Sequence, residues 1–231
     1  ITGDAYVDHP SFGIAIISRM LESCGCNVGI IAQPVTDEDF KKLGEPKYCF
    51  LVTGGNIDSM VSNYTVFKKK RWDDAYSEGG KGGKRPDRAV TVYCKTLTRL
   101  FPDKEIAIGG LEASLRRFAH YDYWADKVHP SVLVDSGADL ISYGMGEKQA
   151  IEIAKRLLDG EPVASITDVR GTCYLVPTRD YRPGPAVECP SYEQVCADKR
   201  AYALSCRKQQ DEQDAVRGKR VIQRHGNQIL V

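Results

Sequence analysis

The residues best suited to chemistry lie in four glycine-bearing turns, each placed just after a short apolar run. The first turn sets carboxylates, a phenol, an imidazole and a hydroxyl near one predicted helix start: Gly3, Asp4, Tyr6, Asp8, His9 and Ser11. The other turns contribute Gly54, Gly55 and Asn56, then Gly109, Gly110 and Glu112, then Gly144, Gly146 and Glu147. Glycines let a ligand approach the backbone, and helix amino termini offer N–H donors to anions. The pattern therefore predicts a ligand-binding edge.

Each polar residue of this set also has a structural interpretation. Asp8 or Ser11 could cap the following helix, Asp4 could be a turn residue, and Glu147 could simply favour a helix dipole. His9 precedes a proline, which holds it in an extended conformation. No Gly-x-Gly-x-x-Gly fingerprint, Walker loop or His-x-x-x-His pair occurs. The residues alone indicate the ligand edge of an α/β domain and no particular reaction.

The elements that must position these turns alternate along roughly the first 165 residues. Helical periodicity covers 12–23, 36–43, 57–67, 86–100 and 150–158, and strand-like runs cover 28–32, 47–53, 105–108 and 139–143. About five β–α repeats predict a parallel sheet with helices on both faces. Right-handed crossovers then bring every strand's carboxyl end to one edge, where open α/β sheets bind ligands.

The expected fold class is therefore α/β: a three-layer, doubly wound, mainly parallel sheet of five or six strands, flavodoxin-like. Residues 1–177 form this Rossmann-like domain, and 178–231 form a C-terminal helical and hairpin extension. The expected parts at the end of the chain are an edge strand at 172–176, a Pro-rich linker at 179–190, a helix from Ser191 and a hairpin at 221–231.

Two charged segments interrupt this alternation. Residues 68–71 read Lys-Lys-Lys-Arg, and the pattern favours the carboxyl end of helix 57–67, where cations suit the dipole, over a phosphate-binding patch. Residues 72–85 form a loop rich in Gly, Lys and Asp, and long loops inside a domain are often functional. Pro86 is expected to open the next helix.

Composition narrows the class of protein. The chain has 231 residues and is 42% hydrophobic, so it can build a sizeable core. Its 32 basic and 31 acidic residues nearly balance, so there is no clear nucleic-acid footprint. The absence of a membrane-length apolar run and of a signal-peptide pattern predicts a cytoplasmic location.

The eight cysteines are expected to be reduced thiols, because the chain has the size and apolar content of a cytosolic protein. No Cys-x-x-Cys pair is present, and Cys49 and Cys94 lie in apolar segments typical of a core. Cys189, Cys196 and Cys206 could form a zinc or cluster site, but their spacing fits no tetrahedral pattern. No metal ligand is assigned.

Several long strings resemble the YgiQ (UPF0313-like) family of radical-SAM proteins. The strings are residues 2–13, Arg85-Pro-Asp-Arg88, residues 109–117, His120-Tyr-Asp-Tyr-Trp124, residues 131–135 with 138–140, and, more loosely, Arg224-His-Gly226. The resemblance covers residues 1–176 and part of the tail. More distantly, Gly109-Gly110 and Gly144-x-Gly-Glu147 resemble the cobalamin-binding-like domain that precedes the barrel in many radical-SAM enzymes. It implies a partial barrel beyond residue 231, whose Cys-x-x-x-Cys-x-x-Cys motif would hold a [4Fe–4S] cluster that binds S-adenosylmethionine.

The resemblance assigns no catalytic residue here, because that cysteine motif is absent from residues 1–231. Both ends of the chain look like cut points.

Cobalamin is not expected, since Asp8 and His9 are adjacent, unlike the Asp-x-His-x-x-Gly turn of cobalamin binders. The implied function is the N-terminal accessory domain of a radical-SAM enzyme of unknown substrate, partnered by its own barrel and not catalytic alone. The alternative is a free-standing module that binds a nucleotide or cobalamin-like ligand.

Overall fold

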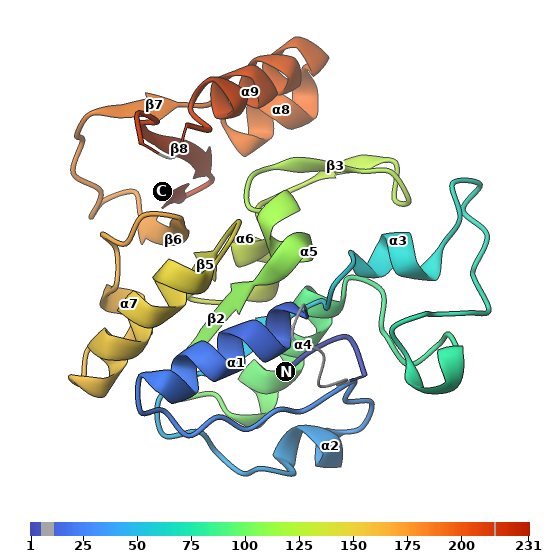
Figure 1. Cartoon of the computed structure of the whole chain (residues 1–231). Helices are drawn as coiled ribbons and strands as arrows, with labels where there is room; N and C mark the ends of the chain where they lie inside the picture. Colours follow the sequence, from blue (N-terminus) through green and yellow to red (C-terminus); the bar gives the residue numbers. More distant parts are fainter. Residues whose placement is uncertain (6–11, 215) are drawn as a thin grey trace.

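The computed structural model describes residues 1–5, 12–214 and 216–231 as an α/β fold around a mixed seven-stranded sheet (Figure 1). The strands run in the order β1-β2-β5-β6-β9-β8-β7, and β3 and β4 form a separate hairpin. Their bounds are β1 Phe50–Thr53, β2 Ile106–Gly109, β3 His120–Asp122, β4 Lys127–His129, β5 Leu140–Ser142, β6 Thr172–Pro177, β7 Ala186–Glu188, β8 Arg220–His225 and β9 Gln228–Leu230.

Helices surround this sheet. Their bounds are α1 Gly13–Ser23, α2 Asp37–Lys41, α3 Ser59–Asn63, α4 Ala89–Leu100, α5 Gly110–Leu115, α6 Val132–Ser136, α7 Glu147–Leu158, α8 Tyr192–Ala197 and α9 Lys199–Asp211, with short 3-10 turns at Glu78–Gly80 and Val163–Ser165. Helices α2 and α8, predicted from residues 36 and 191, each begin with a capping box, formed by the side chains of Thr36 and Ser191 respectively.

The first half of the sheet is parallel. Strand β1 pairs with β2, and β2 pairs with β5, both in parallel register. Two further segments continue this arrangement beyond β1 through isolated parallel bridges, because Thr2 pairs with Thr53 on one side and with Ala32 on the other. The predicted strand at 28–32 is thus reduced to a single bridge. In space, the order is segment 31–33, segment 1–3, β1, β2, β5.

The second half of the sheet is mainly antiparallel. Strand β6 lies between β5 and β9 and is antiparallel to both, and β8 joins β9 in a hairpin. The expectation of an edge strand at 172–176 and of five or six strands is therefore wrong, because the C-terminal hairpin continues the sheet. The predicted linker at 179–190 also contains β7, which pairs with β8 in parallel.

Alternating residues of the central strands fill two core regions, as a sheet covered on both faces requires. On one face Ile106, Ile108 and Ile141 pack in one cluster with side chains of α4 and α6. On the other face Ala107 and Leu140 pack with residues of α7. Helices α1 and α7 lie side by side on this second face (Figure 1).

Two helix boundaries differ from prediction. Helix α4 begins at Ala89 and not at Pro86, because Arg88 has a left-handed backbone (φ 52°) and ends the preceding loop. Helix α3 is short and is followed by a reverse turn in which the Thr65 N–H donates to the Lys69 carbonyl at 2.9 Å. Residues 68–71 consequently lie on a hairpin, so their interpretation as a helix carboxyl end is wrong.

Candidate functional site

The carboxyl ends of the parallel strands meet at one edge. Gly3 donates its N–H to Thr53 at 3.1 Å, Thr53 lies opposite Gly109, and Gly109 lies opposite Ser142. The turns of Gly3, Gly54–Gly55 and Gly109–Gly110 therefore adjoin one another. We call this edge the strand-tip rim. It comprises the turns that follow the parallel strands, at residues 3–4, 54–56, 109–112 and 144–146.

A buried ion network occupies the rim where segment 1–3 meets β1. The Arg85 guanidinium lies 2.7 Å from the Asp4 carboxylate and 3.2 Å from the Asp74 carboxylate, and these side chains are at most 2% exposed. Arg85 Nη1 also donates to the Gly54 carbonyl at 2.6 Å. The Asn56 N–H donates to Asp4 at 2.7 Å. Arg85 thus links the loop after β1 to the carboxylates of Asp4 and Asp74.

The same network closes the long loop at 72–85 onto the rim. The Asp74 carboxylate accepts hydrogen bonds from the Tyr76 N–H and the Ser77 hydroxyl, each at 2.9 Å. Gln33 then donates to Ser77 at 2.6 Å and to the Gly3 carbonyl at 3.0 Å. The loop at 72–85 is therefore bonded to residues at the ends of segment 31–33, segment 1–3 and β1, namely Gln33, Asp4 and Gly54.

Burial and charge act in opposite directions on the two carboxyl groups. Burial raises the pKa of Asp4 above its usual value, although the Asn56 N–H and Arg85 oppose this. Burial also acts to raise the pKa of Asp74, but the Tyr76 N–H and Arg85 outweigh it, so that this pKa is lowered. Between its two carboxylates, the pKa of Arg85 is raised despite the cost of its burial.

Several rim glycines leave room for protein atoms. A Cβ added to Gly55 would lie 2.1 Å from Asp4 Oδ1, and one added to Gly54 would lie 2.6 Å from Glu112 Oε2. A Cβ on Gly3 would lie 2.2 Å from the Gly54 carbonyl oxygen. Close approach of backbone and buried carboxylates explains these glycines physically; their expected role in ligand approach stays a prediction.

Glu112, expected on this edge, holds two helix starts in place. Its carboxylate accepts the N–H of Ser59 at 2.9 Å and the N–H of Val90 at 3.0 Å. These groups belong to the first turns of α3 and α4, where unpaired backbone N–H donors favour an anion. The side chain is 1% exposed, so it faces the protein interior.

The remaining predicted residues divide into two groups. Gly144, Gly146 and Glu147 lie at the tip of β5 and the start of α7, and a Cβ on Gly144 would meet nothing within 4 Å. Tyr6, Asp8, His9 and Ser11 lie outside the described residues.

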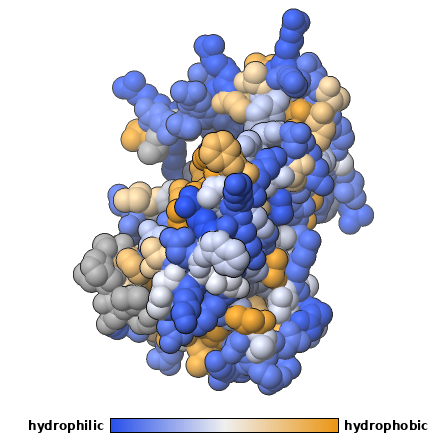
Figure 2. All heavy atoms as spheres, turned by 90° about the vertical axis from the view of Figure 1, so that its right-hand side faces the viewer, coloured by the Kyte–Doolittle hydropathy of each residue, from blue (hydrophilic) through white to orange (hydrophobic). Residues whose placement is uncertain are grey.

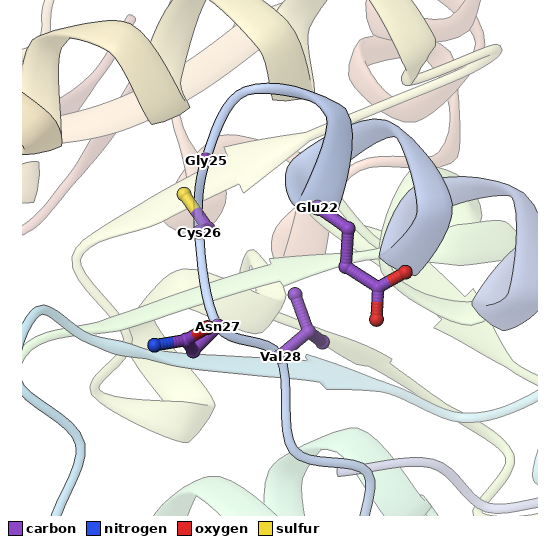
Figure 3. Close-up of a pocket in the computed structure, with 5 residues that line it drawn as sticks. All are labelled: Glu22, Gly25, Cys26, Asn27 and Val28. Carbon is purple, nitrogen blue, oxygen red and sulfur yellow. The ribbon is translucent and has the colours of Figure 1, made fainter.

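One surface depression lies away from the rim. It is lined by Glu22, Gly25, Cys26, Asn27 and Val28, between the carboxyl end of α1 and the start of segment 31–33 (Figure 3). These residues precede a parallel strand segment, so they lie near the opposite edge of the sheet from the strand tips. Figure 3 shows their side chains spread around a loop.

The cysteines of this chain do not suit an iron–sulfur cluster. In the described part of the chain, no three His, Cys, Asp or Glu side chains gather as metal ligands. Cys94, Cys173 and Cys189 are buried, and burial raises the pKa of the Cys94 and Cys173 thiols to about 12, which disfavours the thiolate that a metal requires.

Sequence reasoning missed the central part played by Arg85 and Asp74. Neither was a candidate, because both fall in a charged loop and long-range pairing leaves no local period. The available signals were the length of that loop and the string Arg85-Pro-Asp-Arg88.

Comparison with known proteins agrees with the family that the signature strings resemble. The family model described as "Radical SAM N-terminal" matches residues 1–231. The chain belongs to this radical-SAM family. It is 56% identical to a UPF0313 protein of Clostridium botulinum (strain 657 / Type Ba4), an alignment that covers 100% of the chain and 36% of the relative.

Other relatives show the same relation of lengths. A UPF0313 protein of Methanocella arvoryzae is 54% identical over 100% of the chain and 39% of its own length, and one of Clostridium perfringens (strain 13 / Type A) is 53% identical over 100% and 35%. The chain thus spans little more than a third of these relatives. No solved structure matches it. Among the helices described, none has the length and apolar character needed to cross a bilayer.

Proposed function

We propose that residues 1–231 are the N-terminal accessory region of a radical-SAM enzyme, whose [4Fe–4S] cluster and S-adenosylmethionine are bound by the rest of a longer polypeptide. Family membership and the partial coverage of the relatives support this proposal. The described side chains offer no ligand set for the cluster, so no catalytic step is assigned to them.

The observation that supports a contact between this region and the rest of the enzyme is an exposed apolar face on the rim. Leu111 and Leu115 of α5 are 46% and 60% exposed, and Met145, just after β5, is 83% exposed. The Gly144 N–H donates to the Ser114 hydroxyl at 3.1 Å, which joins these two turns. Apolar side chains clustered on a surface commonly mark contact sites. We infer that this face contacts the remainder of the enzyme.

The strand order supports a flavodoxin-like core for the first half of the chain. Segments 31–33, 1–3, β1, β2 and β5 follow the doubly wound order 2-1-3-4-5. In such sheets the switch point lies between the first and third strands, here between segment 1–3 and β1. Asp4 and Arg85 occupy that point. The alternative is a free-standing module that binds its ligand at this switch point. It receives less support, because the side chains of Asp4 and Arg85 already fill the point.

The test uses the full-length protein, purified anaerobically, beside residues 1–231 alone. Cluster absorbance and cleavage of S-adenosylmethionine are expected only in the full-length protein; their absence there would refute the proposal. Hydrogen exchange at α5 and residues 143–146 should be slower in the full-length protein.

A matched pair of variants tests the contact face. Leu115→Glu should lower S-adenosylmethionine cleavage and restore fast exchange in α5. Leu204→Glu serves as the control, since Leu204 lies on α9 with a similar exposure of 48%. Equal effects of the two substitutions would remove the face from the proposal while leaving the enzyme assignment standing. Ligand-dependent thermal stabilisation of residues 1–231 alone would favour the alternative.

A further inference from the structure

A hairpin beside the rim concentrates positive charge. Lys68, Lys69, Lys70 and Arg71 follow α3 on the turn closed by Thr65, and all four are exposed. In the described part of the chain, no carboxylate lies within ion-pair distance of them. The near balance of 32 basic and 31 acidic residues in the whole chain does not reveal this local excess of positive charge.

Aromatic side chains flank these cations. Phe67 is 82% exposed and Trp72 is 94% exposed, although both are large and apolar. Figure 2 faces the side of the molecule on which α3 and this hairpin lie, and shows hydrophobic groups separated by hydrophilic ones. A run of four cations between two exposed rings differs from the continuous apolar face of a helix or sheet interface.

The hairpin borders a depression of about 260 Å³ lined in part by Tyr64, Lys68, Arg88 and Trp124. The ring centroids of Tyr64 and Trp124 are 6.4 Å apart. The buried Trp124 Nε1 donor has no hydrogen-bond partner among the described residues. The volume is slightly below the range of drug-sized pockets, about 300 Å³ and above, so it suits one planar ring.

The walls of this depression are held in place. Arg88 pairs with Asp122 at 2.7 Å, and the Tyr64 hydroxyl donates to Asp87 at 2.7 Å. The Tyr123 hydroxyl donates to the Val66 carbonyl at 2.7 Å, which joins the two hairpins. The strings 85–88 and 120–124, singled out in the sequence, therefore meet at this point.

We propose that this surface binds a segment of single-stranded nucleic acid. The four cations would contact successive phosphates, exposed rings would stack on bases, and one base would enter the depression beside the Tyr64 and Trp124 rings. A lipid surface would use the exposed Phe67 and Trp72, but it would leave the depression lined by Tyr64 and Trp124 without a ligand, so a nucleic-acid segment fits better. The proposal is independent of the radical-SAM assignment.

The chain carries its own probe, because its two tryptophans, Trp72 and Trp124, both lie on this surface. Titration of the 231-residue chain with a mixed-sequence single-stranded decanucleotide should quench tryptophan fluorescence, with binding that weakens as salt rises. A duplex of the same length should bind more weakly, because its bases are already stacked.

Charge variants test the phosphate contacts. Lys69→Ala with Lys70→Ala should weaken binding about tenfold or more at low salt and reduce the logarithmic salt slope by about 1.4, roughly 0.7 per lost contact. Lys148→Ala with Lys155→Ala removes the same charge from exposed positions of α7 and should leave binding unchanged. Trp72→Ala should weaken binding about fivefold or more.

Three results would overturn the proposal: no quenching by the decanucleotide, equal binding of the duplex, or equal losses in the two double-lysine variants. Vesicles of phosphatidylcholine with phosphatidylserine provide a further arm. Binding to these vesicles without binding to the oligonucleotide would assign the surface to a membrane and would also overturn it.

Discussion

Replacing the buried arginine of the rim should destabilise the fold strongly. Arg85→Met keeps an unbranched side chain but removes the cation that faces Asp4 at 2.7 Å and Asp74 at 3.2 Å, and it also leaves the Gly54 carbonyl without its donor. Breaking a buried ion pair typically costs about 3–5 kcal/mol, because a charge remains uncompensated. This is a large part of the roughly 5–15 kcal/mol that stabilises most domains.

The assay is urea unfolding followed by circular dichroism at pH 8 and pH 5.5. Without Arg85, the pKa values of Asp4 and Asp74 should rise in the folded state, because burial then acts unopposed by the guanidinium. The folded variant binds protons more readily than the unfolded chain, so its stability deficit should shrink as the pH falls. Adding Asp74→Asn should recover part of the loss at pH 8.

The control is an arginine with similar geometry but without burial. Arg99 pairs with Asp37 at 2.6 Å, and these side chains are 58% and 47% exposed. Arg99→Met should therefore have little effect, since solvent screens exposed pairs. The reasoning fails if Arg85→Met is no more destabilising than Arg99→Met, or if its deficit is the same at both pH values.

Two further perturbations separate local from tertiary effects. Gly55 and Gly83 share a left-handed backbone, with φ values of 103° and 104°, but a Cβ on Gly55 would lie 2.1 Å from Asp4 whereas one on Gly83 would meet nothing within 4 Å. Urea unfolding should therefore show Gly55→Ala to be more destabilising than Gly83→Ala by about 1–3 kcal/mol, and equal losses would contradict the packing argument. Burial lowers the pKa of His225, stacked on Tyr192, to about 4. The neutral imidazole should therefore contribute its full stabilisation above about pH 6.5. Between pH 6.5 and pH 4, the free energy of unfolding of the wild type should fall by up to about 3 kcal/mol relative to that of His225→Phe. If the two proteins lose stability in parallel over this range, the prediction is refuted.

Local features of this fold could be predicted from the residues alone. The helical periods of α1 and α7, the capping residues Thr36 and Ser191, and the C-terminal hairpin all depend on neighbours a few positions apart. The adjacency of the glycine turns at Gly3, Gly54 and Gly109 followed from parallel β–α repetition, since that topology brings strand carboxyl ends together.

Long-range pairing settled the rest. The interior position of β6 depends on β9, which lies far along the chain, and residues 68–71 belong to a hairpin because α3 ends at Asn63. The burial of Arg85 between Asp4 and Asp74 likewise brings distant segments together. The periodicity of a sequence shows which face of a helix or strand is apolar. It does not show which residues from distant segments will pair, as Arg85 and Asp4 do, or which side chain will pack against a glycine, as Asp4 does at Gly55.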